Sequence, residues 1–201
     1  MTKDLRLFIA VPIQLKLKRK FFNLVNQLKS IGANVKWVKE ENFHITLKFL
    51  GDTPESRLDE VESAIRSALE GFSPARLKFG GIGAFPNFRR PSVLWIGLES
   101  GYEELSAIAG NLEDSLERLG YEREHRKFRS HLTIGRVKSQ KGVSKLMEKA
   151  EFLKKFDGGN MKLTHIYLMK SDLGPSGPTY TVLREFPLTS PPQNEFSGSL
   201  F

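Results

Sequence analysis

The sequence contains no cysteine, which excludes disulfides, thiolate nucleophiles and cysteine-based zinc sites. It also lacks long hydrophobic runs. The first apolar stretch, RLFIAVPI at residues 6–13, is too short to span a membrane and does not have the layout of a signal peptide. We therefore expect a cytoplasmic protein that does not enter a membrane. Histidine is scarce as well, with 4 in 201 residues, so a repeated pattern around histidine carries information.

The charge balance is basic. Lysine and arginine number 31 against 23 acidic residues, a net charge of +8. This excess favours a polyanionic partner such as nucleic acid, although proteins that bind none also carry it. The hydrophobic content of 39% is enough for a compact core. We expect one domain over residues 1–187, a C-terminal tail over residues 188–201, and a monomer.

Apolar periodicity and turn residues predict mixed α and β structure. The predicted helices cover residues 15–31, 55–69, 102–119 and 143–156. The predicted strands cover residues 5–11, 35–38, 44–50, 75–85, 92–100, 130–137, 161–170 and 180–186. The two halves of the chain each contain a strand with the same short motif, followed by a turn and a helix. We therefore expect two related lobes that face each other across a groove.

The repeated motif places a histidine and a threonine two residues apart. It occurs in FHITLKFLG at residues 43–51 and in SHLTIGRV at residues 130–137. Side chains i and i+2 of a strand share a face, so His44 lies beside Thr46 and His131 beside Thr133. One such strand would be ordinary, because threonine favours strands. Two of them, among four histidines, indicate a shared site.

Two histidines on opposed strands suit in-line displacement at phosphorus. A neutral imidazole removes a proton from water, and an imidazolium protonates the departing oxygen. Threonine hydroxyls can donate to phosphate oxygens that gain charge in the transition state. This chemistry needs no metal and no cofactor, and we expect neither. Because one imidazole must be neutral and the other charged, we expect a bell-shaped pH profile with its maximum near neutrality.

The two motifs resemble those of the 2H phosphoesterase superfamily, specifically the RNA 2′,3′-cyclic phosphodiesterases once called 2′-5′ RNA ligases. RLFIAVPI, PSVLWIGL and SDLGPSGPTYTVLREFPL look similar to that family too. The resemblance implies an α+β, bilobal, LigT-like fold, in which two pseudo-symmetric lobes of mainly antiparallel sheet line a groove with helices outside. Ser130 stands where the family usually has proline, a change that affects only the strand entry.

The resemblance also implies the reaction. It predicts hydrolysis of RNA 2′,3′-cyclic phosphate ends to a 2′-phosphate, with His44 as general acid on the 3′ oxygen and His131 as general base on water. The same groove could also join a 2′,3′-cyclic end to a 5′-hydroxyl, which is 2′-5′ ligation. Arg136 is implied as a phosphate ligand, but strict alternation puts it on the face of Leu132 and Ile134. Arg136 reaches the groove only if the strand bends or bulges.

Two basic residues are further candidates for substrate binding. Lys48 has the parity of His44 and Thr46, so it either lines the groove or is a solvated strand-end lysine. Arg126 lies in the charged loop EREHRKFR before the second motif, where it either contacts RNA or is simply solvated. The alternative to an enzyme is a non-catalytic protein that binds single-stranded RNA with such basic loops.

Overall fold

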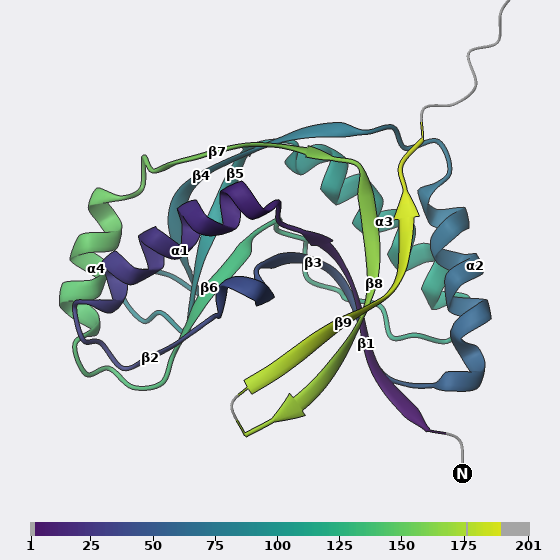
Figure 1. Ribbon diagram of the computed structural model, residues 1–201, viewed down its shortest axis with the longest axis horizontal. Coiled ribbons are helices and arrows are strands. Elements are labelled where there is room, and N and C mark those ends of the chain that lie inside the picture. The colour runs from purple at the N-terminus through teal and green to yellow at the C-terminus, as the bar shows by residue number, and fades with distance from the viewer. Residues whose placement is uncertain (1–2, 176, 190–201) are drawn as a thin grey trace, which may run out of the picture.

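The computed structural model describes residues 3–175 and 177–189. In this part of the chain the backbone forms one nine-stranded sheet with the order β7-β4-β5-β6-β3-β1-β8-β9, and β2 pairs with β6 beside that path. Every neighbouring pair is antiparallel. Figure 1 shows the sheet as curled, with its strands crossing between two groups of helices. The predicted α+β class and mainly antiparallel sheet are confirmed.

The strands and helices follow the predicted order closely. The strands are β1 (Asp4–Pro12), β2 (Val35–Trp37), β3 (His44–Pro54), β4 (Ala75–Phe85), β5 (Val93–Ser100), β6 (Leu132–Val137), β7 (Asp157–Leu163), β8 (His165–Gly174) and β9 (Gly177–Pro187). The helices are α1 (Leu15–Lys29), α2 (Leu58–Leu69), α3 (Tyr102–Glu117) and α4 (Val143–Phe152), with short 3₁₀ turns η1 (Glu40–Asn42) and η2 (Glu55–Arg57).

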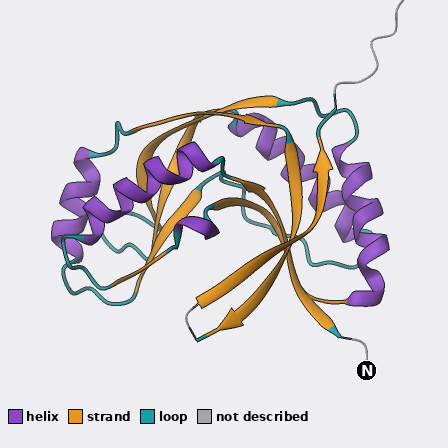
Figure 2. Ribbon diagram, in the orientation of Figure 1, coloured by secondary structure: helices purple, strands orange, loops and turns teal. Residues whose placement is uncertain are grey.

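The helices form because each has an apolar stripe to bury. On α3, Leu105, Ile108, Leu112 and Leu116 recur at spacings of three and four and are all fully covered, as expected for one face of an amphipathic helix. Figure 2 shows that the helices gather in two groups, on opposite sides of the molecule, with strands between them. Their buried faces and the strands share one continuous hydrophobic core.

The two lobes do not correspond to the two halves of the chain. Helix α1, from the first half, packs with α4 and β7 of the second half, and α2 packs with α3. The strand order likewise places β1 and β3 next to β8 and β9, and β4 and β5 next to β6 and β7. The expected pair of lobes is therefore built by strands and helices that cross over repeatedly. The lobes meet where β3 pairs with β6.

The prediction of a single strand over residues 161–170 is wrong. It is two strands, β7 and β8, divided at Thr164. The burial pattern explains the break, because Met161 and Leu163 are covered and the next covered positions, Ile166 and Leu168, have the opposite parity. Strand β7 pairs with β4 at one edge of the sheet, whereas β8 pairs with β1 in the other lobe.

The predicted tail begins inside the core. Leu188 is 4% exposed, and its backbone amide donates to the Thr164 carbonyl at 2.8 Å. The packed chain therefore continues past the expected boundary of the domain at residue 187. Residues 190–201 of the predicted tail lie outside the described residues.

Candidate active site

The two histidine motifs lie on neighbouring strands at the junction of the lobes. Strands β3 and β6 pair through Ile45 and Leu132, which are both fully buried on the core side. Because opposed residues of an antiparallel pair share a face and run in reverse order, His44 lies across from Thr133 and Thr46 across from His131. Each imidazole therefore faces a hydroxyl on its own strand and one on the neighbouring strand.

Backbone carbonyls set the same tautomer on both rings. His44 Nδ1 lies 2.7 Å from the Asn42 carbonyl oxygen, and His131 Nδ1 lies 2.7 Å from the Arg129 carbonyl oxygen. A carbonyl can only accept, so each Nδ1 donates its hydrogen and each Nε2 keeps a lone pair in the neutral ring. Thr46 Oγ1 lies 3.0 Å from His44 Nε2. Both Nε2 atoms are thus the ones available for proton transfer.

Aromatic rings enclose each imidazole. Phe8 and Tyr180 contact His44 at ring-centroid distances of 5.0 and 5.2 Å. On the other strand, Phe85 lies 4.9 Å from His131 and Trp95 lies 6.4 Å away. These rings remove water from the imidazoles and restrict their rotation. Phe85 and Trp95 could be considered from the sequence as rings that stack on a base, but none of the four was selected as a site residue, because Gly/Pro-rich turns often expose single aromatics.

Burial makes both histidines weaker bases than usual. Desolvation lowers the pKa of His44 to about 4, against a partial rise from the Asn42 carbonyl, and the charges of Lys18, His131 and Arg136 lower it further. Burial also lowers the pKa of His131, with the Arg129 carbonyl opposing it and the Arg136 charge adding to it. In the free protein at neutral pH, His44 is therefore a neutral ring.

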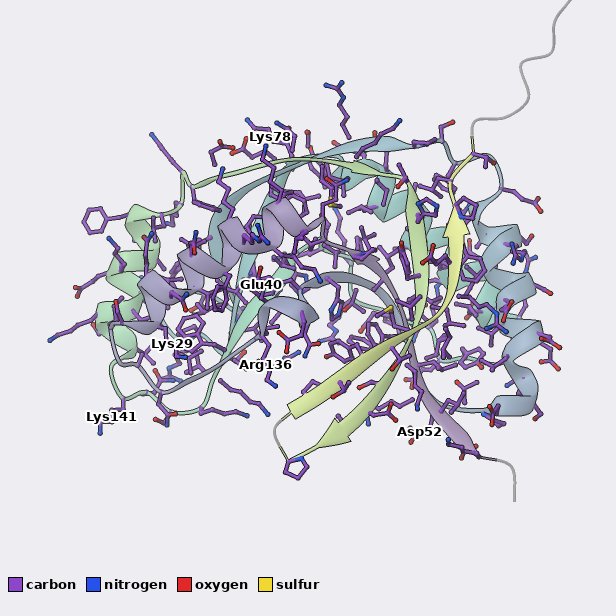
Figure 3. The ribbon with its side chains drawn as sticks, in the orientation of Figure 1. Lys29, Glu40, Asp52, Lys78, Arg136 and Lys141 are labelled. Carbon is purple, nitrogen blue, oxygen red and sulfur yellow. The ribbon has the colours of Figure 1, made fainter. Side chains whose placement is uncertain are left out.

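A β-bulge brings Arg136 to the histidine face. Thr133 pairs with Trp95 and Gly135 with Leu94, so Ile134 is an extra residue on β6. Beyond the bulge Arg136 pairs with Val93, which has the same parity as Trp95, and opposed residues share a face. The condition stated from the sequence, a bulge in this strand, is met. Arg136 is labelled in Figure 3.

The expected position of Lys48 on the histidine face is wrong. Strand β3 also has a bulge, because Ala10 pairs with Thr46 and Ile9 with Lys48, leaving Leu47 as the extra residue. Lys48 therefore shares the face of the buried Ile9. It is 4% exposed, and its Nζ lies 2.6 Å from Glu113 Oε2. A lysine buried in this way does not face a phosphate on the histidine side of the sheet.

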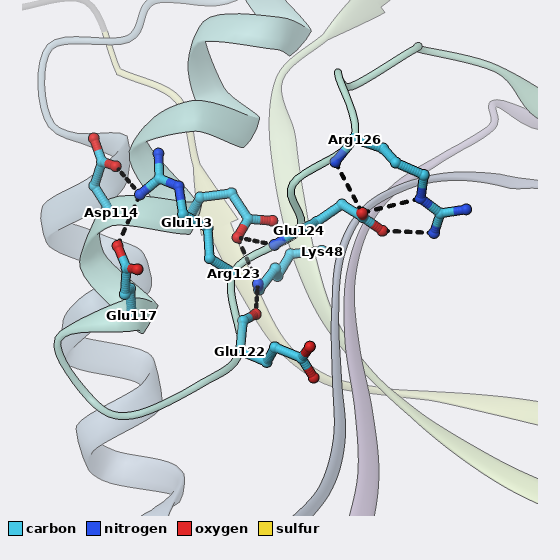
Figure 4. A network of polar contacts seen from close by, with 8 residues as sticks. All are labelled: Lys48, Glu113, Asp114, Glu117, Glu122, Arg123, Glu124 and Arg126. Carbon is cyan, nitrogen blue, oxygen red and sulfur yellow. Dashed lines mark hydrogen bonds and ion pairs between the residues drawn. The ribbon is translucent and has the colours of Figure 1, made fainter.

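Arg126 lies on the surface in the loop before β6, and its side chain is 88% exposed. Its guanidinium forms a two-point contact with the Glu124 carboxylate, at 3.0 and 2.7 Å, and this pair holds the pKa of Glu124 at about 2. Figure 4 shows the contact at the outer end of a chain of polar interactions. Arg126 stays a candidate for RNA contact. To bind an RNA phosphate, its guanidinium would have to leave the Glu124 carboxylate.

Lys18 is a cation near the site that sequence reasoning missed. Its Nζ donates to the Glu41 carbonyl at 2.9 Å, next to Asn42, whose own carbonyl holds His44. The Asn42 side chain is buried and donates to the Pro178 carbonyl of β9 at 2.9 Å. The turn that orients His44 is thus fixed from α1 and from β9, elements far from it in sequence. The one local signal was the polar Asn42 directly before the first motif.

A family model described as "LigT like Phosphoesterase" matches residues 11–95 and again residues 96–180. The chain belongs to the LigT-like phosphoesterase family. Each match contains one histidine motif, which supports the predicted internal repeat. The predicted resemblance to 2H phosphoesterases is therefore confirmed, and each half of this LigT-like phosphoesterase carries one of the two motifs.

Relatives and solved structures agree with this assignment. The chain is 37% identical over 183 residues to an RNA 2′,3′-cyclic phosphodiesterase of Methanothermobacter thermautotrophicus, covering 91% of this chain and 98% of the relative. A protein of Archaeoglobus fulgidus with the same description is 37% identical over 186 residues, covering 90% and 99%. The crystal structure of TT0787 of Thermus thermophilus superposes with a TM-score of 0.77 at 26% identity, covering 92% and 98%. E. coli LigT complexed with 3′-AMP has the same fold, with a TM-score of 0.75 at 20% identity and coverage of 93% and 99%.

Proposed function

We propose that this LigT-like phosphoesterase hydrolyses the 2′,3′-cyclic phosphate at the end of an RNA to a 2′-phosphate. The observation that carries the proposal is the matched pair of imidazoles, each with Nδ1–H bound to a carbonyl and Nε2 available. Relatives 37% identical over nine-tenths of the chain bear the name RNA 2′,3′-cyclic phosphodiesterase. The basic charge of the chain also suits an RNA substrate. We further propose that the protein acts as a monomer in the cytoplasm.

The proposed reaction is an in-line displacement. His131 Nε2 accepts a proton from water, the water oxygen bonds to phosphorus, and the bond from phosphorus to the 3′ oxygen breaks. His44 Nε2–H donates its proton to that oxygen, so the products are a 2′-phosphate and a free 3′-hydroxyl. Arg136, Thr46 and Thr133 bind the non-bridging oxygens, where charge increases in the transition state. If a 5′-hydroxyl takes the place of water, the same contacts give 2′-5′ ligation: its oxygen bonds to phosphorus, its proton goes to His131, and the bond to the 3′ oxygen breaks.

The anionic phosphate itself brings the histidines into the required protonation state. Burial leaves His44 neutral in the free protein, and a negative charge between the rings favours the protonated form of either ring. The substrate therefore supplies the interaction that retains one proton on the pair. The charge of Arg136 opposes protonation of both rings.

The test uses an oligoribonucleotide labelled at the 5′ end and terminated in a 2′,3′-cyclic phosphate, incubated in excess chelator. We expect a 2′-phosphate product, identified against 2′- and 3′-phosphate standards, at the rate found without chelator. A 3′-phosphate product would show that the 2′ oxygen leaves and would contradict the proposed direction of ring opening. Loss of activity that an added divalent ion restores would contradict a metal-independent reaction, and RNA binding without hydrolysis would favour the non-catalytic alternative.

A further inference from the structure

Lys48 is a buried cation for which the proposed reaction has no use. Its side chain is 3% exposed and that of Glu113, its partner on α3, is 13% exposed. A buried ion pair is often no more stabilising than two well-packed apolar side chains, so fold stability alone does not explain it. An ion pair can do one thing that apolar residues cannot, which is to bind backbone groups of a neighbouring segment.

The pair binds the backbone of the loop that leads to the second histidine. Lys48 Nζ donates to the Glu122 carbonyl, and Glu113 Oε2 accepts from the Glu124 amide at 3.1 Å. Residues 121–131 form no helix or strand, so these bonds replace the backbone pairing that the loop lacks. Figure 4 shows the pair between β3, α3 and the loop.

The far end of this loop orients the catalytic ring. The Arg129 carbonyl accepts from His131 Nδ1 at 2.7 Å, and this bond aims Nε2. We propose that Lys48 and Glu113 are positioning residues, which hold the loop so that the Arg129 carbonyl can fix His131. Lys48 follows His44 and Thr46 on β3, so it ties the strand of the first motif to the approach of the second. This proposal rests on the proposed function only for its effect on activity.

The test is the double variant Lys48→Met/Glu113→Met, which removes both charges and keeps long unbranched side chains. Replacing both partners avoids leaving one buried charge unpaired. Imidazole signals followed by NMR should show the pKa of His131 falling further below its usual value, because the Arg129 carbonyl that raises it is no longer held at Nδ1, whereas the pKa of His44 stays as in the unmodified protein. The other groups that face His131, namely Arg136, Phe85 and Trp95, are unchanged in the variant.

Activity gives the second measurement. On a 2′,3′-cyclic mononucleotide we expect kcat to fall at least about tenfold with KM within about threefold, as for a misaligned acid-base group. Lys48→Gln/Glu113→Gln leaves no unpaired charge and keeps a donor for the Glu122 carbonyl and an acceptor for the Glu124 amide. It should give a smaller change in both measurements, which provides a reading if the methionine double variant does not fold. The matched control is Arg123→Gln, since Arg123 joins the same loop to the same helix by exposed contacts with Asp114 and Glu117. We expect it to change kcat less than about twofold.

Two results would distinguish a failure of the positioning role from a failure of the proposed function. If the folded double variant keeps the His131 titration and kcat of the unmodified protein, Lys48 and Glu113 support only the fold. If the unmodified protein opens no cyclic phosphate, the proposed function fails. In that case the His131 titration, which needs no substrate, still supports or overturns the positioning role.

Discussion

At the scale of single residues, the two imidazoles are the groups whose removal should matter most. We expect His44→Ala and His131→Ala each to lower kcat/KM on a cyclic-phosphate end at least about a hundredfold, the usual cost of losing a general acid or base. Thermal melts would confirm that both variants fold. His165→Ala is the control, because His165 bonds only Thr164 within the described residues. Near-normal activity of either active-site variant would rule out the two-histidine reaction.

The lowered pKa values change the pH profile expected from the sequence. With the pKa of His44 at about 4 and that of His131 below its usual value, the singly protonated pair of the free protein is most abundant below neutrality. The bell of kcat/KM, which reports the free enzyme, should therefore peak on the acid side and not near pH ~7. The bell of kcat should peak at higher pH, because bound phosphate raises both pKa values. Coincident bells near neutrality would contradict the role assigned to burial.

At the scale of strands and helices, the bulged strand β6 depends on a glycine. A Cβ on Gly135 would lie 2.7 Å from Val35 and 3.0 Å from Trp37, so β2 could not approach as it does. Gly135→Ala should lower the free energy of unfolding by about 1–3 kcal/mol, the usual cost of overpacking, as measured by urea denaturation. The control is Gly110→Ala in α3, where a Cβ would meet nothing within 4 Å. That change should raise stability by about 0.5–1 kcal/mol, and equal effects at the two glycines would contradict the close approach.

At the scale of the whole molecule, the net charge of +8 should make RNA binding depend on salt. Arg126→Gln/Lys127→Gln removes two exposed charges from the loop before β6. The slope of log affinity against log salt for single-stranded RNA should become shallower by up to about 1.4, at about 0.7 per phosphate contact, as measured by fluorescence anisotropy. Hydrolysis of a cyclic mononucleotide should persist, because this loop tip lies outside the two histidine strands.

A charge-matched control separates the loop from the overall charge. Lys145→Gln/Lys149→Gln removes two exposed charges from α4, at the outer edge of the other lobe (Figure 1). We expect the slope to stay unchanged in this variant. Equal flattening by both pairs would show that overall charge, and not the loop, governs binding. Loss of mononucleotide hydrolysis in the loop variant would place Arg126 or Lys127 in the catalytic centre.

The described part of the chain has no helix long and apolar enough to cross a membrane. The same residues bring together no group of three or more His, Asp or Glu side chains that could hold a metal ion. The chain as a whole crosses repeatedly between the two lobes. The two histidine strands come from opposite halves of the sequence and meet in one sheet through a single pair, Ile45 and Leu132.

The local pattern of the sequence was sufficient for the helices, for the reactive pair and for the strands other than the segment over residues 161–170, which is two strands. Alternation within FHITLKFLG and SHLTIGRV is a property of a few consecutive residues, so it correctly predicts that His44 shares a face with Thr46 and His131 with Thr133. The amphipathic stripe of α3 is local in the same sense. The family assignment also followed from these motifs, because both lie unbroken in the sequence.

The tertiary structure alone decided what the residues next to those motifs do. A bulge forms when a strand carries one residue more than its partner, and the partner of each motif strand is far away in the sequence. Two such bulges bring Arg136 to the histidines and turn Lys48 away to Glu113. Desolvation has the same origin, because the rings that enclose His44 and His131 come from other strands. Alternation is set by the chain itself, whereas bulges and burial are set by its neighbours, which the sequence does not state.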